Sequence, residues 1–321
     1  MGAFLTRFAS DPQHPAAEPK ARLSSLEYAV YSTVAYRDVF DFAPTLSEIH
    51  RYLHSVRCEP KDVEAAIRQG RLLDQYLVSD GRLFALRGRA HILALRSQRQ
   101  ATVQKFWPLA RAYARFLASF PHVRMVALTG SFAAQNLRED GDIDFMLLTD
   151  AGAMWRTRAL AMSAALCNRK FGNQKFCPNV FLSMAALSLG RKSLYDAHEL
   201  SQMVPLYGHA AYERLREANQ WSEDYLPNAR GAPIVAQPAV TVGLPALRAA
   251  AEWVSNSPVG KALENFEAKR KIHRFNETDR LKGTWTKSTR ESHSLRDSIR
   301  QEIEDAWRQR VEALNAMEAS S

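Results

Sequence analysis

The chain has 321 residues, of which 46% are hydrophobic and 24% are charged, with a formal net charge of +9. This composition is typical of folded globular proteins and excludes disordered and collagen-like chains. Cys58, Cys167 and Cys177 lie far apart, which excludes a disulfide framework and indicates a reducing, cytoplasmic location. No run reaches the roughly 18 apolar residues of a membrane span, so we expect a soluble protein without a membrane partner.

Two segments, one at the N-terminus and one near the C-terminus, have distinctive compositions. Residues 1–22 are rich in Ala and Pro and predict a flexible tail. Basic residues are densest from 267 to 301, where Glu and Asp alternate with them. A solvated helical surface is one interpretation of this region, and binding of nucleic acid or of nucleotide phosphates is the other.

Residues 23–98 predict a first domain of three short helices followed by a hairpin. Thr45 and Glu48 have the spacing of a capping box, which marks the start of the second helix. A third helix is predicted over 60–71, and the turn dipeptide Asp80-Gly81 joins two alternating runs. This order of elements resembles a winged helix-turn-helix.

The winged-helix resemblance implies contact with DNA through the third helix. That helix, however, mixes basic and acidic side chains (Lys61, Arg68 and Arg71 against Glu59, Asp62 and Glu64), which is a poor electrostatic match to phosphates. Packing against another domain or protein is therefore the alternative to a DNA partner.

Residues 99–190 form the second predicted domain. A long helix leads into a strand over 122–128, and the chain then reaches Gly130-Ser131 at a change from strand to helix. Asp142 and Asp144 flank Ile143 at the start of a second apolar strand. Residues i and i+2 of a strand point to the same face, so the two carboxylates project together. They repel unless a cation lies between them, and oxygen ligands of this kind suit Mg²⁺.

The apolar strand, Gly-Ser, spacer, Asp-x-Asp and second apolar run are similar to the signature of the DNA polymerase beta-type nucleotidyltransferase superfamily. The resemblance implies an α/β (α+β) core with a short mixed sheet. Gly130 and Ser131 would bind a nucleoside triphosphate, and Asp142 and Asp144 would coordinate one or two Mg²⁺ ions. The implied reaction transfers a nucleoside monophosphate to a hydroxyl of a small molecule or protein and releases pyrophosphate.

The chain departs from this superfamily at the third carboxylate, which usually stands on a following strand. Asn179 occupies the expected place within KFCPNVFLS. An amide offers a carbonyl oxygen as a ligand but no negative charge, and it cannot accept a proton from an attacking hydroxyl. The alternative hypothesis is therefore a catalytically impaired protein that binds nucleotides, or a regulator associated with DNA.

Basic residues near the motif are candidates for phosphate contacts. Arg158, and with it Arg156, follows the second strand, and Lys175 precedes the third. The guanidinium fork matches phosphate oxygens, so Arg158 is predicted to bind the nucleotide together with Asn179. Solvation at the surface is the alternative for each basic residue.

Residues 191–321 predict a helical C-terminal region. Such regions shape the acceptor pocket in this superfamily, which makes Tyr207, Trp221 and Tyr225 candidates for lining it, with core packing as the alternative. The whole arrangement resembles bacterial nucleotidyltransferase-domain proteins with an N-terminal winged helix.

Overall fold

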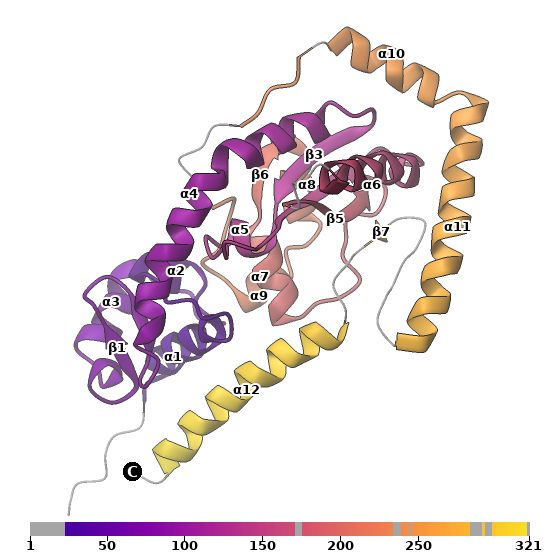
Figure 1. The fold of residues 1–321 in the computed structure, drawn as a ribbon. Coiled ribbons are helices and arrows are strands. Elements are labelled where there is room, and N and C mark those ends of the chain that lie inside the picture. The colour runs from indigo at the N-terminus through magenta and orange to yellow at the C-terminus, as the bar shows by residue number, and fades with distance from the viewer. Residues whose placement is uncertain are drawn as a thin grey trace, which may run out of the picture.

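The structure is a computed structural model, which describes residues 23–170, 175–233, 239–243, 245–282, 291–292 and 297–319. The predicted tail, 1–22, lies outside the described residues. The fold is mixed α/β, with helices around a five-stranded mixed sheet and a separate two-stranded hairpin (Figure 1). The predicted fold class is confirmed at this level. None of the described helices combines the length and apolarity needed to cross a membrane.

The N-terminal part contains three helices and then a hairpin. The elements are α1 (Ser25–Asp38), α2 (Leu46–Arg51), α3 (Pro60–Arg68), a π-helical turn (Leu72–Tyr76), β1 (Leu77–Ser79) and β2 (Phe84–Leu86). The hydroxyl of Thr45 accepts from the Glu48 amide, and the Glu48 carboxylate accepts from the Thr45 amide, so the predicted capping box starts α2. Asp80 accepts from the amides of Arg82 and Leu83 in the hairpin turn.

Helix α4 (His91–Ala118) joins the N-terminal part to the sheet without a break (Figure 1). Its first turns pack through Ile92 against the hairpin residue Leu83, and its later turns pack through Trp107 against the sheet. The domain boundary predicted at 98/99 therefore falls inside one continuous helix. Pro108 lies within this helix.

The sheet has the strand order β6-β3-β4-β5-β7, and only β4 and β5 are parallel. Its strands are β3 (Val123–Leu128), β4 (Ile143–Thr149), β5 (Phe176–Ser183), β6 (Val204–Tyr207) and β7 (Glu291–Ser292). The sequence placed 204–207 in a helical region, and this was wrong, because these residues form β6. Pro205 is compatible with a strand here since β6 is at the sheet edge, where a missing N–H costs no ladder bond.

Both faces of the sheet are covered by helices. Alternate residues of β3 and β4 pack on one face against α4, α6 (Met154–Lys170) and α11 (Pro258–Lys282). The residues between them face α7 (Leu194–Gln202) and α8 (His209–Glu217). The other helices are α5 (Gly130–Ala133), α9 (Ser222–Tyr225), α10 (Pro245–Ser255) and α12 (Asp297–Ala319).

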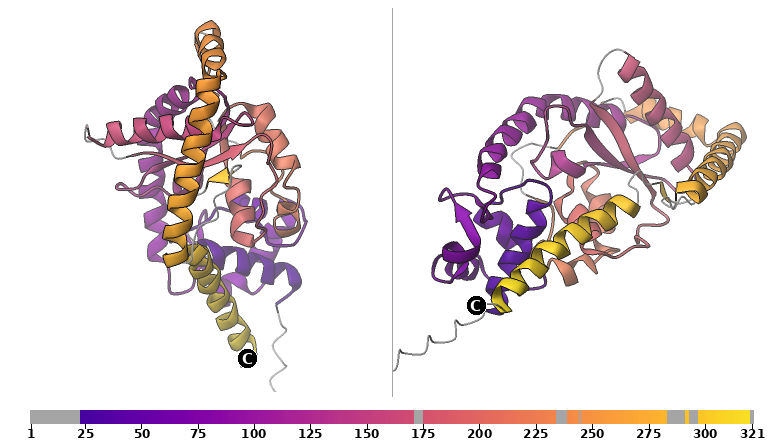
Figure 2. Two further views of the ribbon diagram at one scale, coloured as in Figure 1. Left: turned by 90° about the vertical axis from the view of Figure 1, so that its right-hand side faces the viewer. Right: turned by 60° about the horizontal axis from the view of Figure 1, so that its bottom comes forward.

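Helix α12 returns to the N-terminal part and runs beside α1 (Figure 2). Leu314 is fully buried in the same apolar cluster as Val30 and Val34 of α1. The Trp307 indole donates to the Ser32 carbonyl oxygen at 3.2 Å, and the Arg310 guanidinium pairs with Asp38 at 2.7 Å. The region predicted as a helical C-terminal unit is thus shared between the sheet and the N-terminal helices.

Candidate functional site

The Gly-Ser turn lies directly against the second acid of the Asp-x-Asp motif. Strand β3 runs antiparallel to β4, and the Thr129 amide donates to the Asp144 carbonyl oxygen at 3.0 Å. Gly130 has a φ of 60°, in the left-handed region that favours glycine. A Cβ at this position would lie 2.8 Å from Asp144 Oδ2, closer than side chains approach one another. The backbone conformation therefore favours glycine, and a larger residue would have to displace the neighbouring carboxylate.

The side chains of β4 alternate between faces as the motif predicts. Ile143 and Phe145 are fully buried on the face covered by α4, while Asp144 points to the opposite face with Met146. Asp142, just before the strand, is exposed, and its charge acts on Asp144. The two carboxylates of the motif are thus neighbours at the start of β4.

Strand β5 brings Asn179 to Asp144 through a bulge. The β4–β5 register shifts between the pairs Phe145–Pro178 and Met146–Val180, which leaves Asn179 as the extra residue. Its amide nitrogen donates to Asp144 Oδ1 at 3.3 Å. Its carbonyl oxygen is buried without a hydrogen-bond partner among the described residues. Asn179 therefore stands beside the motif acid, with one oxygen available to a ligand.

The environment of Asp144 disfavours its charge in the absence of a cation. Burial raises the pKa of Asp144 to about 6, and the Asp142 charge adds to the effect, whereas hydrogen bonds from the Cys177 thiol and the Asn179 amide oppose it. Burial and the nearby Asp144 carboxylate also raise the pKa of Cys177 to about 12, so this thiol stays protonated and acts as a donor. A bound cation would favour the charged form of Asp144 and so lower its pKa.

Gly130, Ser131 and Asp144 line one cavity of about 270 Å³, which we call the Gly130 cavity. Its remaining wall comes from α1 and the segment after it, from the loop after α5, and from one face of α7. The α7 residues stand at positions i, i+3, i+4 and i+7, which share a helical face. The lining residues besides the three above are Tyr36, Arg37, Phe40, Phe42, Ala134, Asn136, Tyr195, His198, Glu199 and Gln202.

Glu199 adds a carboxylate that the sequence did not single out. Burial, with the charges of Asp144 and Asp196, raises the pKa of Glu199 to about 7, although hydrogen bonds from the Gly130 amide and the Gln202 side chain oppose this. Gln202 Nε2 donates to Glu199 Oε1 at 2.6 Å. Nothing in the local sequence distinguishes Glu199 from other helical glutamates, because only the packing of α7 against the sheet places it in the cavity.

The structure does not bring the predicted arginines of α6 to this cavity. Arg158 lies with its Cζ 5.8 Å from the ring centres of both Trp155 and Phe181. Arg156 is buried and reaches His122 Nε2 at 3.1 Å. Both rings beside Arg158 are buried in the cluster on the α6 face of the sheet, whereas Asp144 faces α7.

Lys175 supports the loop that carries Asp142. Its ammonium donates to the carbonyl oxygens of Glu139 and Gly141 at 2.5 and 3.0 Å. It also lies 4.6 Å from the ring centre of Phe106. These contacts hold the chain just before the Asp-x-Asp motif.

The three aromatic residues proposed to line an acceptor pocket lie elsewhere. Tyr207 accepts a hydrogen bond from Arg248 at 2.5 Å on the β6 edge, and the Trp221 indole donates to Asn219 at 3.1 Å. Tyr225 lines a second cavity of about 590 Å³, which is bordered by α1, α12 and the start of α7. The aromatic side chains at the Gly130 cavity come instead from α1, the segment after it, and Tyr195.

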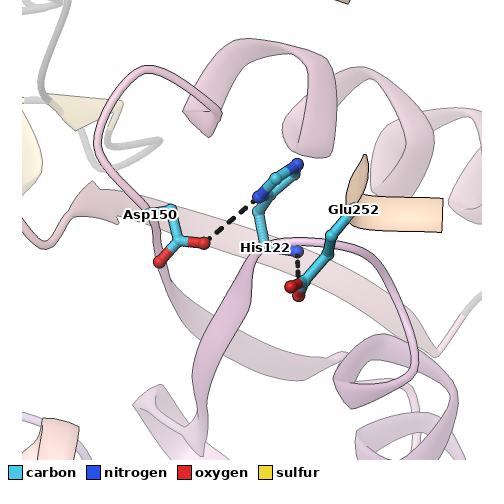
Figure 3. A group of neighbouring side chains, drawn as sticks. All are labelled: His122, Asp150 and Glu252. Carbon is cyan, nitrogen blue, oxygen red and sulfur yellow. Dashed lines mark hydrogen bonds and ion pairs between the residues drawn. The ribbon is translucent and has the colours of Figure 1, made fainter. Parts of the chain in front are cut away.

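His122, Asp150 and Glu252 form a separate group of metal-ligand types, with ligand atoms within 4.8 Å of one another (Figure 3). Arg124 pairs with both carboxylates, at 2.9 Å to Glu252 Oε1, and His122 Nδ1 lies 3.1 Å from Asp150 Oδ2. Burial raises the pKa of Glu252, but hydrogen bonds from Arg124 and the His122 amide lower it to about 2.

Arginines already occupy the surroundings of this group. Arg248 contacts Glu252 at 3.2 Å, and Arg156 approaches the histidine ring from its other nitrogen. Cations that are supplied by the chain compensate both carboxylates, so the geometry indicates an ion-pair network that holds α10 against the ends of β3 and β4. We do not assign a metal to it.

No family model matches the chain, and comparisons with curated proteins and with solved structures also find no match. The functional assignment therefore depends on the motif and on the geometry around it.

Proposed function

We propose that the protein is a Mg²⁺-dependent nucleotidyltransferase that transfers a nucleoside monophosphate to a hydroxyl group and releases pyrophosphate. The observation that carries the proposal is the close approach of Gly130 to Asp144, because it brings the Gly-Ser turn to the second acid of the Asp-x-Asp motif in a cavity that Glu199 also lines. A fortuitous acidic turn would not need a glycine pressed against its carboxylate.

The acidic residues fit a hard divalent cation. Asp142 and Asp144 would hold Mg²⁺, with the buried Asn179 Oδ1, which has no hydrogen-bond partner among the described residues, as a further oxygen ligand. Such an ion would neutralise the charge that develops on the phosphates during in-line displacement. The raised pKa of Asp144 supports this assignment, since a bound cation allows a buried carboxylate beside another acid to stay ionised.

The remaining groups of the cavity supply positioning and proton transfer. The Ser131 hydroxyl is suited to bind a phosphate oxygen, and the Gly130 amide, which donates to Glu199, positions that carboxylate beside it. Glu199, with a pKa of about 7, is suited to accept the proton of the attacking hydroxyl. The hydroxyl oxygen then bonds to the alpha phosphorus as the bond to the bridging oxygen breaks, and pyrophosphate leaves. Glu199 thereby supplies the base that Asn179 cannot.

The size of the cavity favours a small acceptor. At about 270 Å³ it is slightly smaller than typical small-molecule sites, and helices α1 and α7 both border it. A hydroxyl of a small molecule therefore fits better than one on a protein surface.

The alternative is a nucleotide-binding protein with impaired catalysis, and the amide at Asn179 is the feature that favours it. A role on DNA has weaker support, because Arg68 of α3 already pairs with Glu64 at 2.9 Å on the helix surface. The N-terminal helices contribute instead to the cavity through α1.

Pyrophosphate release tests the proposal. Purified protein with Mg²⁺, each labelled nucleoside triphosphate and an extract of small hydroxyl compounds should release pyrophosphate and label one compound. Asp144→Asn should reduce the rate at least about a hundredfold, whereas Asp140→Asn, in an exposed acid beside the motif that pairs with Arg138, should leave it unchanged. Absence of turnover with all four nucleotides would favour the impaired alternative.

A further inference from the structure

Arg37 is a buried cation in the wall of the Gly130 cavity. Its side chain is 5% exposed, and it pairs with no carboxylate in the part of the chain that the structure describes. Arg37 Nη1 donates to Gln202 Oε1 at 3.3 Å, and its Nε has no hydrogen-bond partner among those residues. Buried charges are normally paired, since desolvation of an uncompensated charge is costly.

Arg96 provides an internal comparison for Arg37. Both guanidinium groups lie near the ring of Phe42, with Cζ at 4.1 Å from its centre for Arg96 and 5.4 Å for Arg37. Arg96 is 3% exposed but forms an ion pair with Glu48 at 2.7 Å. Packing against an aromatic ring is therefore common to both, and of the two only Arg37 has no ion-pair partner among the described residues.

Two further buried groups beside Arg37 have unused hydrogen-bonding capacity. Tyr36 and His198 are each 1% exposed, line the same cavity, and stack with ring centres 4.0 Å apart. The Tyr36 hydroxyl and His198 Nδ1 have no partner among the described residues. Three residues that line one cavity, Tyr36, Arg37 and His198, thus each keep a buried polar atom without a hydrogen-bond partner among the described residues.

A chain of hydrogen bonds behind His198 can set its free nitrogen as a donor. Ser32 Oγ lies 2.8 Å from His54 Nδ1, and His54 Nε2 lies 3.2 Å from His198 Nε2. Two proton arrangements satisfy this chain. In the one where Ser32 donates to His54 and His54 donates to His198, the hydrogen of His198 is on Nδ1. An anion in the cavity selects that arrangement.

We propose that Arg37, Tyr36 and His198 form a subsite for an oxyanion, a phosphate or carboxylate group of a small-molecule substrate. An oxyanion provides the missing negative charge and the acceptors for all three groups. The carboxylates of Asp144 and Glu199 line the same cavity and favour a cation. A substrate bound together with Mg²⁺ would therefore place an anion beside Arg37 and a cation beside the carboxylates. As a substrate subsite it rests on the proposed function, whereas binding of an anion is measurable without any transfer reaction.

Calorimetric titration with inorganic phosphate, in the presence of Mg²⁺ and at low ionic strength, tests the subsite. Arg37→Met should weaken phosphate binding about tenfold or more, because a hydrogen-bonded charge is lost. Tyr36→Phe removes only an unpaired hydroxyl and should weaken binding by a smaller factor with no loss of thermal stability. Equal phosphate affinity in the wild type and in Arg37→Met overturns the proposal, as does absence of binding by the wild type.

Thermal unfolding without phosphate separates a binding role from a structural one. Arg37→Met should unfold at the same temperature as the wild type or higher, since it removes an uncompensated buried charge. Arg96→Met should unfold at a lower temperature, because it leaves Glu48 without its partner. If Arg37→Met is destabilised as much as Arg96→Met and Tyr36→Phe binds phosphate like the wild type, the subsite assignment fails.

A second titration identifies the source of the anion. Wild-type protein saturated with Mg²⁺ and inorganic triphosphate is titrated with phosphate and with acetate. Binding that persists and depends on Arg37 assigns the subsite to an anionic group of the acceptor. Competition between phosphate and triphosphate, together with weaker triphosphate binding by Arg37→Met, assigns it to the nucleotide. If neither signal depends on Arg37, there is no subsite. Pyrophosphate release is not a readout in these titrations, so this result is independent of the transfer reaction.

Discussion

Replacement of Gly130 by alanine should damage the fold and the carboxylate site together. The φ of 60° costs an alanine about 1–2 kcal/mol relative to the right-handed regions. The new Cβ would also meet Asp144 Oδ2 at 2.8 Å, and overpacking of this kind costs about 1–3 kcal/mol. The two effects predict a loss of about 2–5 kcal/mol in the free energy of unfolding. Alanine also lowers the conformational entropy of the unfolded chain, and this stabilises the folded state by about 0.4–1 kcal/mol and offsets part of the loss.

Gly152 supplies a matched control for the backbone effect alone. Its φ is 71°, and a Cβ there would have no neighbour within 4 Å. Gly152→Ala should therefore lower the free energy of unfolding by about 1 kcal/mol. The stabilising effect of alanine through the unfolded chain should be the same as for Gly130→Ala. The difference between the two variants, about 1–3 kcal/mol, isolates the contact with the Asp144 carboxylate.

Urea unfolding followed by tryptophan fluorescence measures both variants, since the chain has 6 tryptophans. Titration with Mn²⁺ should show weaker metal binding for Gly130→Ala and wild-type binding for Gly152→Ala. If the two variants lose the same stability within about 0.5 kcal/mol and bind Mn²⁺ alike, then Gly130 does not press against Asp144, and the main support for the proposed function is lost.

Three other outcomes are expected. Asn179→Asp should tighten Mn²⁺ binding about tenfold, because it adds a charge beside Asp144, and unchanged affinity in calorimetry would refute that position. Burial lowers the pKa of His54 from 6.5 to about 3, so the unfolded chain binds a proton between these pH values that the folded chain does not, and stability falls as pH falls through this window. His54→Gln should make that fall shallower by about 1.4 kcal/mol per pH unit in urea titrations at several pH values, and parallel slopes would contradict the assignment. Glu252→Gln should lower the free energy of unfolding by about 1–3 kcal/mol, against less than about 0.5 for the exposed Glu64→Gln, and equal losses would remove the argument for an ion-pair network.

Local patterns predicted the part of the site that local structure builds. The alternation around Ile143 placed Asp142 and Asp144 beside each other, because the side-chain period of a strand depends on the chain alone. The Gly-Ser turn was recognisable because Gly130 follows directly after the apolar run that forms β3. The position of Asn179 beside Asp144 also agrees with the expected register of the next strand, although its bulge was not foreseen.

The rest of the cavity depends on packing between segments that are distant in sequence. Tyr36 and Arg37 lie in an apolar helix whose composition indicates only a buried element, and Glu199 looks like any helical glutamate. Their common position arises from the packing of α1 and α7 around the sheet, which no local pattern encodes. The error at β6 has a similar origin, since Pro205 disfavours a central strand and only the edge position makes it acceptable.

The return of α12 to α1 affects the order in which the chain can fold during synthesis. Tyr31 of α1 donates to the carbonyl oxygen of Arg310, 279 residues later in the sequence. Until that part of the chain leaves the ribosome, one apolar side of the first helix has no permanent cover. We expect the N-terminal helices to be held by a chaperone or in a loose state for most of translation, and the cavity wall that they form to be completed late.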